Sequence, residues 1–402
     1  MTTITDPMNN ADLKAIDGRS GGFYALLAGL AVVVVAGLWA AHTMEAQGHH
    51  VTGMNNQIVW GIPHVFAVFL IVSASGALNA ASLSSVMGQK IYTPYARLSG
   101  LLAMALLLGG LAIITLDLGR PERVMVALSH FNMASVFAWN VFFYTGFLLL
   151  AALYLWTLME RTMNRLTKPV AAVLLAWRLT LTTATGLIFG VLVARQAYDT
   201  VIMAPLFIAM SLSFGSAAFT LLLLTACDWT DRPLDDAVLR ALRRMMALCI
   251  IVVLCFVAIF HGVKLYAVGF DGVEAFLLVD GGVFPLLFWL GQIAAGSLLP
   301  LWLLMWRPLA AARARTATAA GLVLLGGLAQ VYVIVIGAQA FPLEIFPGKQ
   351  IIESSFYDGV INRYHPSLLE FLLAFAGVAM ALMIVVLCMK ILPFLPRMRA
   401  RD

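Results

Sequence analysis

Ten long apolar runs dominate this chain of 402 residues. Each is about 20 residues or longer, the length that an α-helix needs to cross a hydrocarbon core of about 30 Å. Within such a core every backbone polar group must bond inside the protein, so only helices and closed barrels span it. Barrel strands are alternating segments of roughly ten residues. The sequence therefore predicts an all-α, polytopic membrane protein.

The first run is longer than the 7 to 15 apolar residues of a signal peptide, so we expect a retained first helix.

A composition of 62% hydrophobic and 11% charged residues lies far outside the soluble range. An even number of spans puts both termini on one side. The ten expected spans are approximately Gly22–Ala41, Ile58–Ala80, Tyr95–Leu116, Ala134–Met159, Pro169–Ala194, Val201–Cys227, Arg244–Tyr266, Gly282–Trp306, Thr318–Ala340 and Ser367–Ile391.

Positive charges sort strongly between the two sides of this topology. Of the 25 Lys and Arg residues, 18 fall on the side of the termini and six on the other, while Arg178 lies inside a span. Lys and Arg favour cytoplasmic loops. We therefore expect a cytoplasmic N-terminal segment over residues 1–21, a transmembrane domain over 22–393 and a cytoplasmic tail over 394–402. All seven histidines fall at the opposite end.

The four cysteines show no spacing typical of a cluster or zinc site. Neither an iron–sulfur cluster nor a bound metal is expected in this chain. A haem remains an alternative, because His64 and His261 lie near helix ends and histidines on facing helices could ligate one. Any iron–sulfur centre must belong to a partner.

The stretch around the end of the third span carries acid, base and hydrogen-bonding groups. Asp117 and Arg120 are three residues apart, so we expect them to share a helix face that Pro121 then ends. If the bundle buries them, Asp117 becomes a proton acceptor poised by Arg120; the alternative is an exposed ion pair of little energetic value. The side chains expected to close the same pocket are His130, Asn132, Ser135 and Trp139.

At the start of the second span Asn56, Trp60 and His64 recur every four residues. On a helix they would line one stripe, with His64 roughly 9 Å beyond Ile58, near the depth of a quinone head group. Pro63 is expected to loosen this helix. The alternative is an interfacial tryptophan beside a capped histidine.

Two further polar groups lie elsewhere in the spans. Arg178 falls near the bilayer centre, so it must face the bundle interior, and Thr182 and Thr185 follow on the same face. These three residues form a proton path, or Arg178 has a structural role and bonds to backbone carbonyls. His261, at the outer end of the seventh span, either complements the first site or docks a partner.

Several of these motifs resemble one known family. The ten-span plan, the Trp60-Gly61 pair, the helix end at 116–121 and the stretch from His130 to Trp139 resemble the NrfD/PsrC family of polysulfide-reductase-type membrane subunits. Within it the chain is most similar to the DsrP-type subunits of the DsrMKJOP complex of dissimilatory sulfur metabolism. Members with eight helices carry a His directly before the Trp-Gly pair, whereas Val59 stands here.

The resemblance implies two four-helix bundles, approximately 58–194 and 201–340, with the first and tenth helices as flanking additions. It also implies a subunit without haem or iron–sulfur cluster that binds quinone or quinol near the outer face of a bacterial inner membrane. Electrons would pass to or from a periplasmic ferredoxin-like iron–sulfur subunit, with cytochrome c and other redox subunits in the complex.

We therefore expect quinone/quinol redox chemistry, in which Asp117, poised by Arg120, exchanges the proton and His64 or Asn56 bonds a quinone carbonyl. Trp60 and Trp139 would pack against the ring. The alternatives are a haem-bearing cytochrome b-type subunit and a secondary transporter that uses Arg178 for an anionic substrate. The expected landing surface for the partner is the segment 341–366, with Glu344, Glu353 and Asp358.

Overall fold

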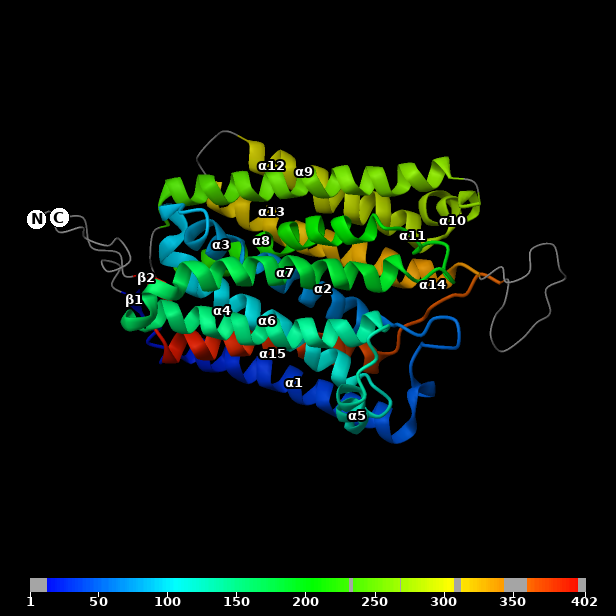
Figure 1. The fold of residues 1–402 in the computed structure, drawn as a ribbon, viewed down its shortest axis with the longest axis horizontal. Coiled ribbons are helices and arrows are strands. Elements are labelled where there is room, and N and C mark those ends of the chain that lie inside the picture. The colour runs from blue at the N-terminus through cyan, green and yellow to red at the C-terminus, as the bar shows by residue number, and fades with distance from the viewer. Residues whose placement is uncertain (1–12, 231–233, 268, 307–311, 343–359, 397–402) are drawn as a thin grey trace, which may run out of the picture.

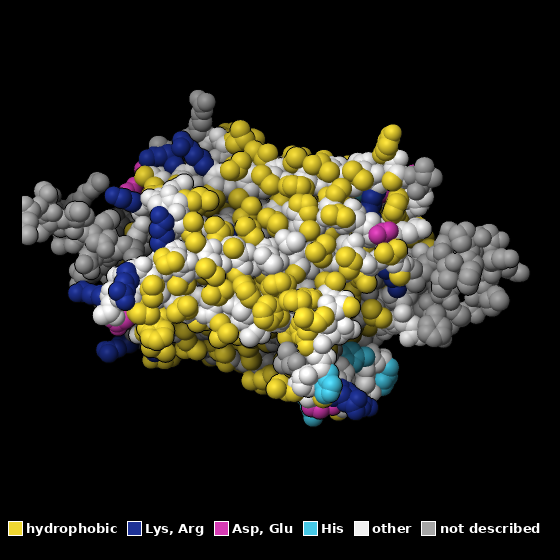
Figure 2. Space-filling model, in the orientation of Figure 1, with side chains coloured by type: hydrophobic (Ala, Val, Ile, Leu, Met, Phe, Trp, Pro, Cys, Tyr) yellow, Lys and Arg dark blue, Asp and Glu magenta, His cyan; other side chains and the backbone are white. Residues whose placement is uncertain are grey.

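A computed structural model describes residues 13–230, 234–267, 269–306, 312–342 and 360–396. Within these ranges ten helices are long and apolar enough to cross a membrane. They run side by side in one elongated bundle (Figure 1). On the face shown in Figure 2, apolar side chains cover the middle of the bundle and charged side chains gather at its two ends. The prediction of an all-α polytopic membrane protein is confirmed.

The spans of the N-terminal half agree closely with the predicted runs. Short 3₁₀ turns precede several of them: η2 (His49–Val51), η3 (Lys90–Tyr95), η4 (Pro121–Arg123) and η5 (Arg161–Leu166). The helices are α1 (Gly21–Gln47), α2 (Ile62–Ala77), α3 (Asn79–Ser85), α4 (Ala96–Leu116), α5 (Val124–Ser129), α6 (Val136–Met159) and α7 (Thr167–Gly190).

The C-terminal half is less regular, because three segments adopt wider π-helical turns: η6 (Phe276–Asp280), η7 (Leu287–Leu298) and η8 (Val333–Gly337). The α-helices there are α8 (Met203–Trp229), α9 (Asp236–Tyr266), α10 (Asp271–Ala275), α11 (Val283–Leu286), α12 (Leu299–Met305), α13 (Ala312–Tyr332), α14 (Ala338–Ala340) and α15 (Leu368–Ile391). Such π-helical turns are often found at functional sites.

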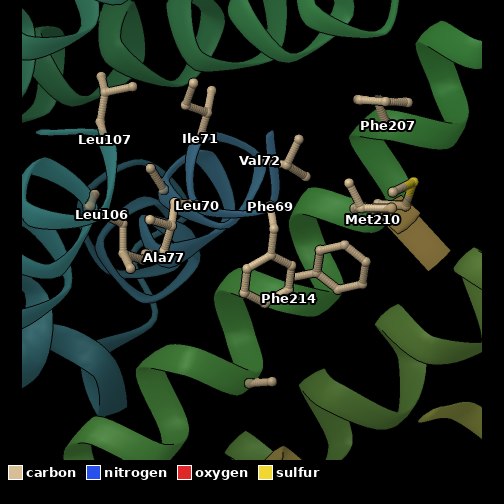
Figure 3. Close-up of a cluster of buried hydrophobic side chains, with 14 of the residues drawn as sticks. Phe69, Leu70, Ile71, Val72, Ala77, Leu106, Leu107, Phe207, Met210 and Phe214 are labelled. Carbon is tan, nitrogen blue, oxygen red and sulfur yellow. The ribbon is translucent and has the colours of Figure 1, made fainter. Parts of the chain in front are cut away.

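The centre of the bundle is the contact of α2 with α4 and α8. Phe69 on α2 packs against Phe214 on α8, with ring centroids 5.4 Å apart, and leucines of α4 close the other side (Figure 3). Farther along, Gly76 and Gly215 let the two backbones approach so closely that a β-carbon on either would overlap the other helix. Small residues at a crossing give this close packing in membranes.

The flanking helices pair with each other, since α1 packs on α15 and α15 packs on α4. Two short strands, β1 (Leu13–Lys14) and β2 (Leu395–Pro396), form an antiparallel pair beyond these helices. This pairing brings both described ends of the chain to the same end of the bundle, as an even number of spans requires. We call the opposite end, where α4 ends and α2 begins, the outer end.

Candidate functional site

A buried carboxylate at the outer end contacts two histidines. Nδ1 of His64, in the first turn of α2, lies 2.9 Å from Oδ2 of Asp117, the C-cap residue of α4. His49 reaches the same residue from η2, the turn that follows α1: its Nε2 donates to the carbonyl oxygen of Asp117 at 2.9 Å and lies 3.9 Å from Oδ1. Three helices thus bring two bases to one acid.

The polar atoms of this group are buried but not saturated. The Asp117 side chain is 1% exposed, whereas those of His64 and His49 are 26% and 31% exposed. Neither carboxylate oxygen of Asp117, nor Nδ1 of His64, makes a hydrogen bond of good geometry within the described residues. Buried polar groups are normally hydrogen-bonded. The arrangement therefore has capacity for a hydrogen-bonding ligand reached past the two histidines.

Trp60 joins this group to an aromatic cluster. Its ring stacks on His64, with centroids 6.2 Å apart and an interplanar angle of 26°. Phe137 of α6, Phe189 of α7 and Tyr198 surround the indole at centroid distances of 5.7 to 6.4 Å. The acid–base group thus adjoins a half-buried aromatic wall that can contact a flat apolar ring.

The backbone around Trp60 is fixed by side chains from distant helices. Oε1 of Gln339, on α14, accepts the N–H groups of Val59 and Trp60 at 2.9 and 3.0 Å. Its Nε2 donates back to the Trp60 carbonyl at 3.1 Å. Arg195 donates to the carbonyls of Gln57 and Gln339 at 2.8 and 3.2 Å. The position of Trp60 is therefore set by the second half of the chain.

A second clamp holds the start of α2. The Tyr364 hydroxyl accepts the N–H of Ile62 at 2.8 Å and donates to the fully buried Glu370. Glu370 also accepts the N–H groups of Gly53 and Ser367 at 2.9 and 2.6 Å. Burial, and then the hydrogen bond to Glu370, raise the pKa of Tyr364, so its hydroxyl remains a donor.

The structure corrects the predicted stripe of Asn56, Trp60 and His64. The helix begins at Ile62, so Asn56 and Trp60 lie in an irregular segment in which Asn55 accepts the N–H groups of Gln57 and Ile58. Pro63 occupies the first turn, where its missing N–H costs nothing, so it does not loosen the helix. Trp60 still meets His64, while Asn56 is exposed.

The expected sharing of a helix face by Asp117 and Arg120 is also wrong. The helix ends at Leu116, and Arg120 has non-helical backbone angles and an exposed side chain. Within the described residues the ion pairs of Asp117 are with His49 and His64. His49 and His64, rather than the predicted Arg120, are therefore the partners of Asp117.

The other residues expected to close the pocket make local contacts. His130 is exposed and bonded to Ser129, Asn132 accepts the N–H of Ala134, and Ser135 caps α6. Trp139 donates to the Met133 carbonyl and packs among Phe131, Phe142 and Phe143. From α6 it is Phe137 that reaches Trp60.

Arg178 is buried inside the bundle, as predicted, and bonds to the break between α2 and α3. Its Nη1 donates to the Ser75 carbonyl at 2.5 Å and to Oδ1 of Asn79 at 2.9 Å. Thr182 joins this network by donating to the Ser75 hydroxyl at 2.7 Å, whereas Thr185 donates to Asn140. These contacts satisfy the Ser75 carbonyl and the Asn79 amide oxygen at a helix break.

The second half of the chain holds another histidine–carboxylate pair at the outer end. Nδ1 of His261 lies 2.6 Å from Oε2 of Glu274, which is fully buried on α10. Lys264 donates to the carbonyls of Gln196 and Ala197 at 2.6 and 2.5 Å. A cavity of about 20 Å³, the volume of one water, lies beside His261 and is lined by Gln292 and Gln330.

Sequence reasoning missed most of the residues that position the site. His49, Gln339, Tyr364 and Glu370 lie between 68 and 317 residues from their partners along the chain. The only local signal was the acid–hydroxyl spacing of Ser367 and Glu370, which form a capping box on α15. Glu344, Glu353 and Asp358, expected on the landing surface, lie outside the described residues.

Comparison with known proteins shows that this chain is similar to membrane subunits of redox complexes. A family model described as "Polysulphide reductase, NrfD" matches residues 50–343. The chain is similar to an Hdr-like menaquinol oxidoreductase integral membrane subunit of Archaeoglobus fulgidus, with 27% identity over 96% of this chain and 97% of that protein.

Two further relatives also bear the names of reductase components. A putative dimethyl sulfoxide reductase membrane subunit of Halobacterium salinarum is 25% identical over 90% of both chains. A selenate reductase subunit of Mesobacillus selenatarsenatis is 21% identical over 85% of this chain and 87% of that protein. The similarity thus extends beyond the family match to α1 and α15.

Proposed function

Since this chain belongs to the polysulphide reductase NrfD family, we propose that it is the quinone-reactive integral membrane subunit of an oxidoreductase complex. The observation that carries this function is the group formed by Asp117, His64 and His49 beside the ring of Trp60. A quinone needs hydrogen-bonding and proton-exchanging groups at its oxygens and an apolar contact for its ring. The chain offers both at the outer end of the bundle.

In the proposed mechanism each residue has one task. A quinol bound here supplies two electrons and two protons, and its oxidised form accepts them. Asp117 exchanges a proton with the ring oxygen, because an acid–base group must lie within hydrogen-bond reach of the proton that it transfers. His64 donates to or accepts from the same oxygen, and His49 holds the backbone of Asp117 in place.

The ring would lie against Trp60, whose position Gln339 fixes through three hydrogen bonds. Asn56, exposed four residues earlier, is the proposed donor to the second ring oxygen. We also propose a polar path on the cytoplasmic side of the site, formed by Arg178, Thr182 and Thr185. We propose that residues of the outer loop form the rim of the site: Arg120, His130, Asn132, Ser135 and Trp139.

Electrons must reach or leave this site through another protein, and we propose a periplasmic ferredoxin-like iron–sulfur subunit at the outer end. Further redox subunits, including a cytochrome c, would complete the complex. The relatives are named as subunits of menaquinol, dimethyl sulfoxide and selenate oxidoreductases, which supports a multisubunit setting. We propose Glu344, Glu353 and Asp358 as docking residues, and a DsrP-type complex of sulfur metabolism as the setting.

The proposed orientation has both termini in the cytoplasm of a bacterial inner membrane. A reporter that is active only in the cytoplasm should be active when it is fused after Asp402. A reporter that is active only after export should be active when it is inserted near Lys349. The reason is the 18 cations that sort to the end of the termini. Reversed signals would place the quinone site on the face away from a periplasmic partner.

The function is tested by titrating the purified complex with quinol while the redox state of the partner's iron–sulfur clusters is measured. We expect saturable reduction or oxidation of the clusters that depends on the added quinol or quinone. Clusters that respond to chemical reductants but never to quinol would contradict the proposal. An optical spectrum of the purified chain distinguishes the alternative of a haem-bearing subunit, which would show haem absorption bands.

A further inference from the structure

A pocket rich in arginine lies at the end of the bundle that carries β1 and β2. It has a volume of about 390 Å³ and opens between the first turns of α9 and the end of α12. Its walls include Arg240, Arg243 and Arg244, with Met305 and Trp306 opposite. Figure 2 shows Lys and Arg side chains gathered at the upper left, where α9 begins. We call this feature the arginine pocket.

Arg243 has a structural task in this pocket. It donates to the carbonyl oxygens of Leu304 and Trp306 at 2.5 and 2.8 Å, which belong to the end of α12. Carbonyls at a helix end lack partners within the helix, and a cation satisfies them. Arg243 therefore holds α12 against α9 and gives the pocket a fixed shape.

Arg240 and Arg244 are not used in this way. Both side chains are exposed, and neither belongs to an ion pair formed by the described residues. The acids at the start of α9 lie before them: Asp235 caps the helix through the N–H of Ala237, and Asp236 is exposed. The pocket thus presents two guanidinium groups, one helical turn apart, with donors available for a bound anion.

The flank of the pocket is apolar and faces the membrane. Arg240, Arg244 and Leu248 follow one another at a spacing of four on α9, and the exposed stripe continues to Ile251 and Ile259. On the other side of the opening Trp302 is exposed on α12, next to the pocket residues Met305 and Trp306. The arginine pocket therefore adjoins exposed apolar side chains of α9 and α12 that hydrocarbon chains can contact.

We propose that the arginine pocket binds the phosphate head group of an anionic phospholipid, whose acyl chains lie along α9 and α12. Arg pairs with phosphate through two parallel hydrogen bonds, and basic pockets between helices on the cytoplasmic side suit anionic lipids. Interfacial tryptophans place their amphipathic rings at head-group depth. A soluble phosphate compound would use the two arginines but would gain nothing from the exposed apolar side chains of α9 and α12.

The experiment uses the full chain, purified and reconstituted in nanodiscs of phosphatidylcholine with or without phosphatidylglycerol. Native mass spectrometry then counts the lipids retained by the wild type and by the double variant Arg240→Gln/Arg244→Gln. The matched control is Arg161→Gln/Arg165→Gln, which removes two exposed arginines from the same end of the bundle. Size-exclusion profiles verify that all three proteins are folded.

We expect the wild type and the control to retain phosphatidylglycerol over phosphatidylcholine. The pocket variant should lose that preference by about 30-fold, since each of the two arginines near an anionic lipid contributes about 1 kcal/mol. Equal lipid preference in the pocket variant and the wild type would overturn the proposal. So would displacement of the lipid by millimolar inorganic phosphate, because the pocket would then be a site for a soluble anion. Neither outcome depends on the quinone site.

Discussion

The substitution Asp117→Asn is expected to lower quinol-linked electron transfer about 100-fold, with membrane insertion intact. A positioned proton acceptor contributes about 10²- to 10⁴-fold to such a step, and 100-fold corresponds to about 2.7 kcal/mol. Asparagine keeps the shape of the side chain and its position beside His64, but it cannot take up the proton. The measurement is the rate at which a menaquinol analogue reduces the partner's clusters in the purified complex.

The matched control is Glu122→Gln, which changes an exposed carboxylate in the same outer loop and should leave the rate unchanged. A companion variant, His64→Ala, removes the histidine that contacts the carboxylate at 2.9 Å and should lower the rate at least about tenfold. Wild-type rates in both Asp117→Asn and His64→Ala, with normal insertion, would remove this group from the mechanism.

The second large effect is expected at Glu370, which lies far from the chemistry in sequence. Glu370→Leu leaves the Tyr364 hydroxyl and the N–H groups of Gly53 and Ser367 without their acceptor in a buried site. Each unsatisfied buried group costs about 1 to 3 kcal/mol, so the chain should lose at least about 3 kcal/mol of stability. Thermal unfolding of the purified chain in detergent measures this loss.

Glu370→Gln keeps one acceptor oxygen and should lose clearly less stability than Glu370→Leu. The control Glu45→Leu changes an exposed glutamate near the outer end of α1 and should unfold like the wild type. The clamp predicts a second effect of Glu370→Leu, a weaker response to quinol, because the start of α2 carries His64. Unchanged stability in Glu370→Leu would show that these three hydrogen bonds do not hold the segment before α2.

The spans were predictable because the bilayer imposes one length on all of them. The predicted end of the third span and the observed end of α4 coincide at Leu116. Differences arise where polar residues continue a helix beyond the hydrocarbon: α9 begins at Asp236, two turns before the predicted Arg244. Hydropathy does not register such extensions, since charged residues are good helix formers outside the core.

The start of α2 shows the opposite error. Ile58 to Gly61 are apolar enough to continue the predicted span, yet Gln339 and Asn55 take up the backbone N–H groups that a helix would use. Gln339 lies about 280 positions away, so no local pattern could reveal its part in this competition. The same reasoning explains why Asp117 was recognised as the acid while His49 was not recognised as its neighbour.

The central claim is that a quinone binds beside Asp117, His64 and Trp60, and photolabelling tests it most directly. A photoreactive quinone analogue is irradiated with the purified complex, and the labelled peptides are identified by mass spectrometry. We predict label in the segment 57–66 or around Asp117, reduced by an excess of unmodified quinone and weakened in Asp117→Asn. Competable label confined to the second half of the chain, around His261 and Glu274, would contradict the account.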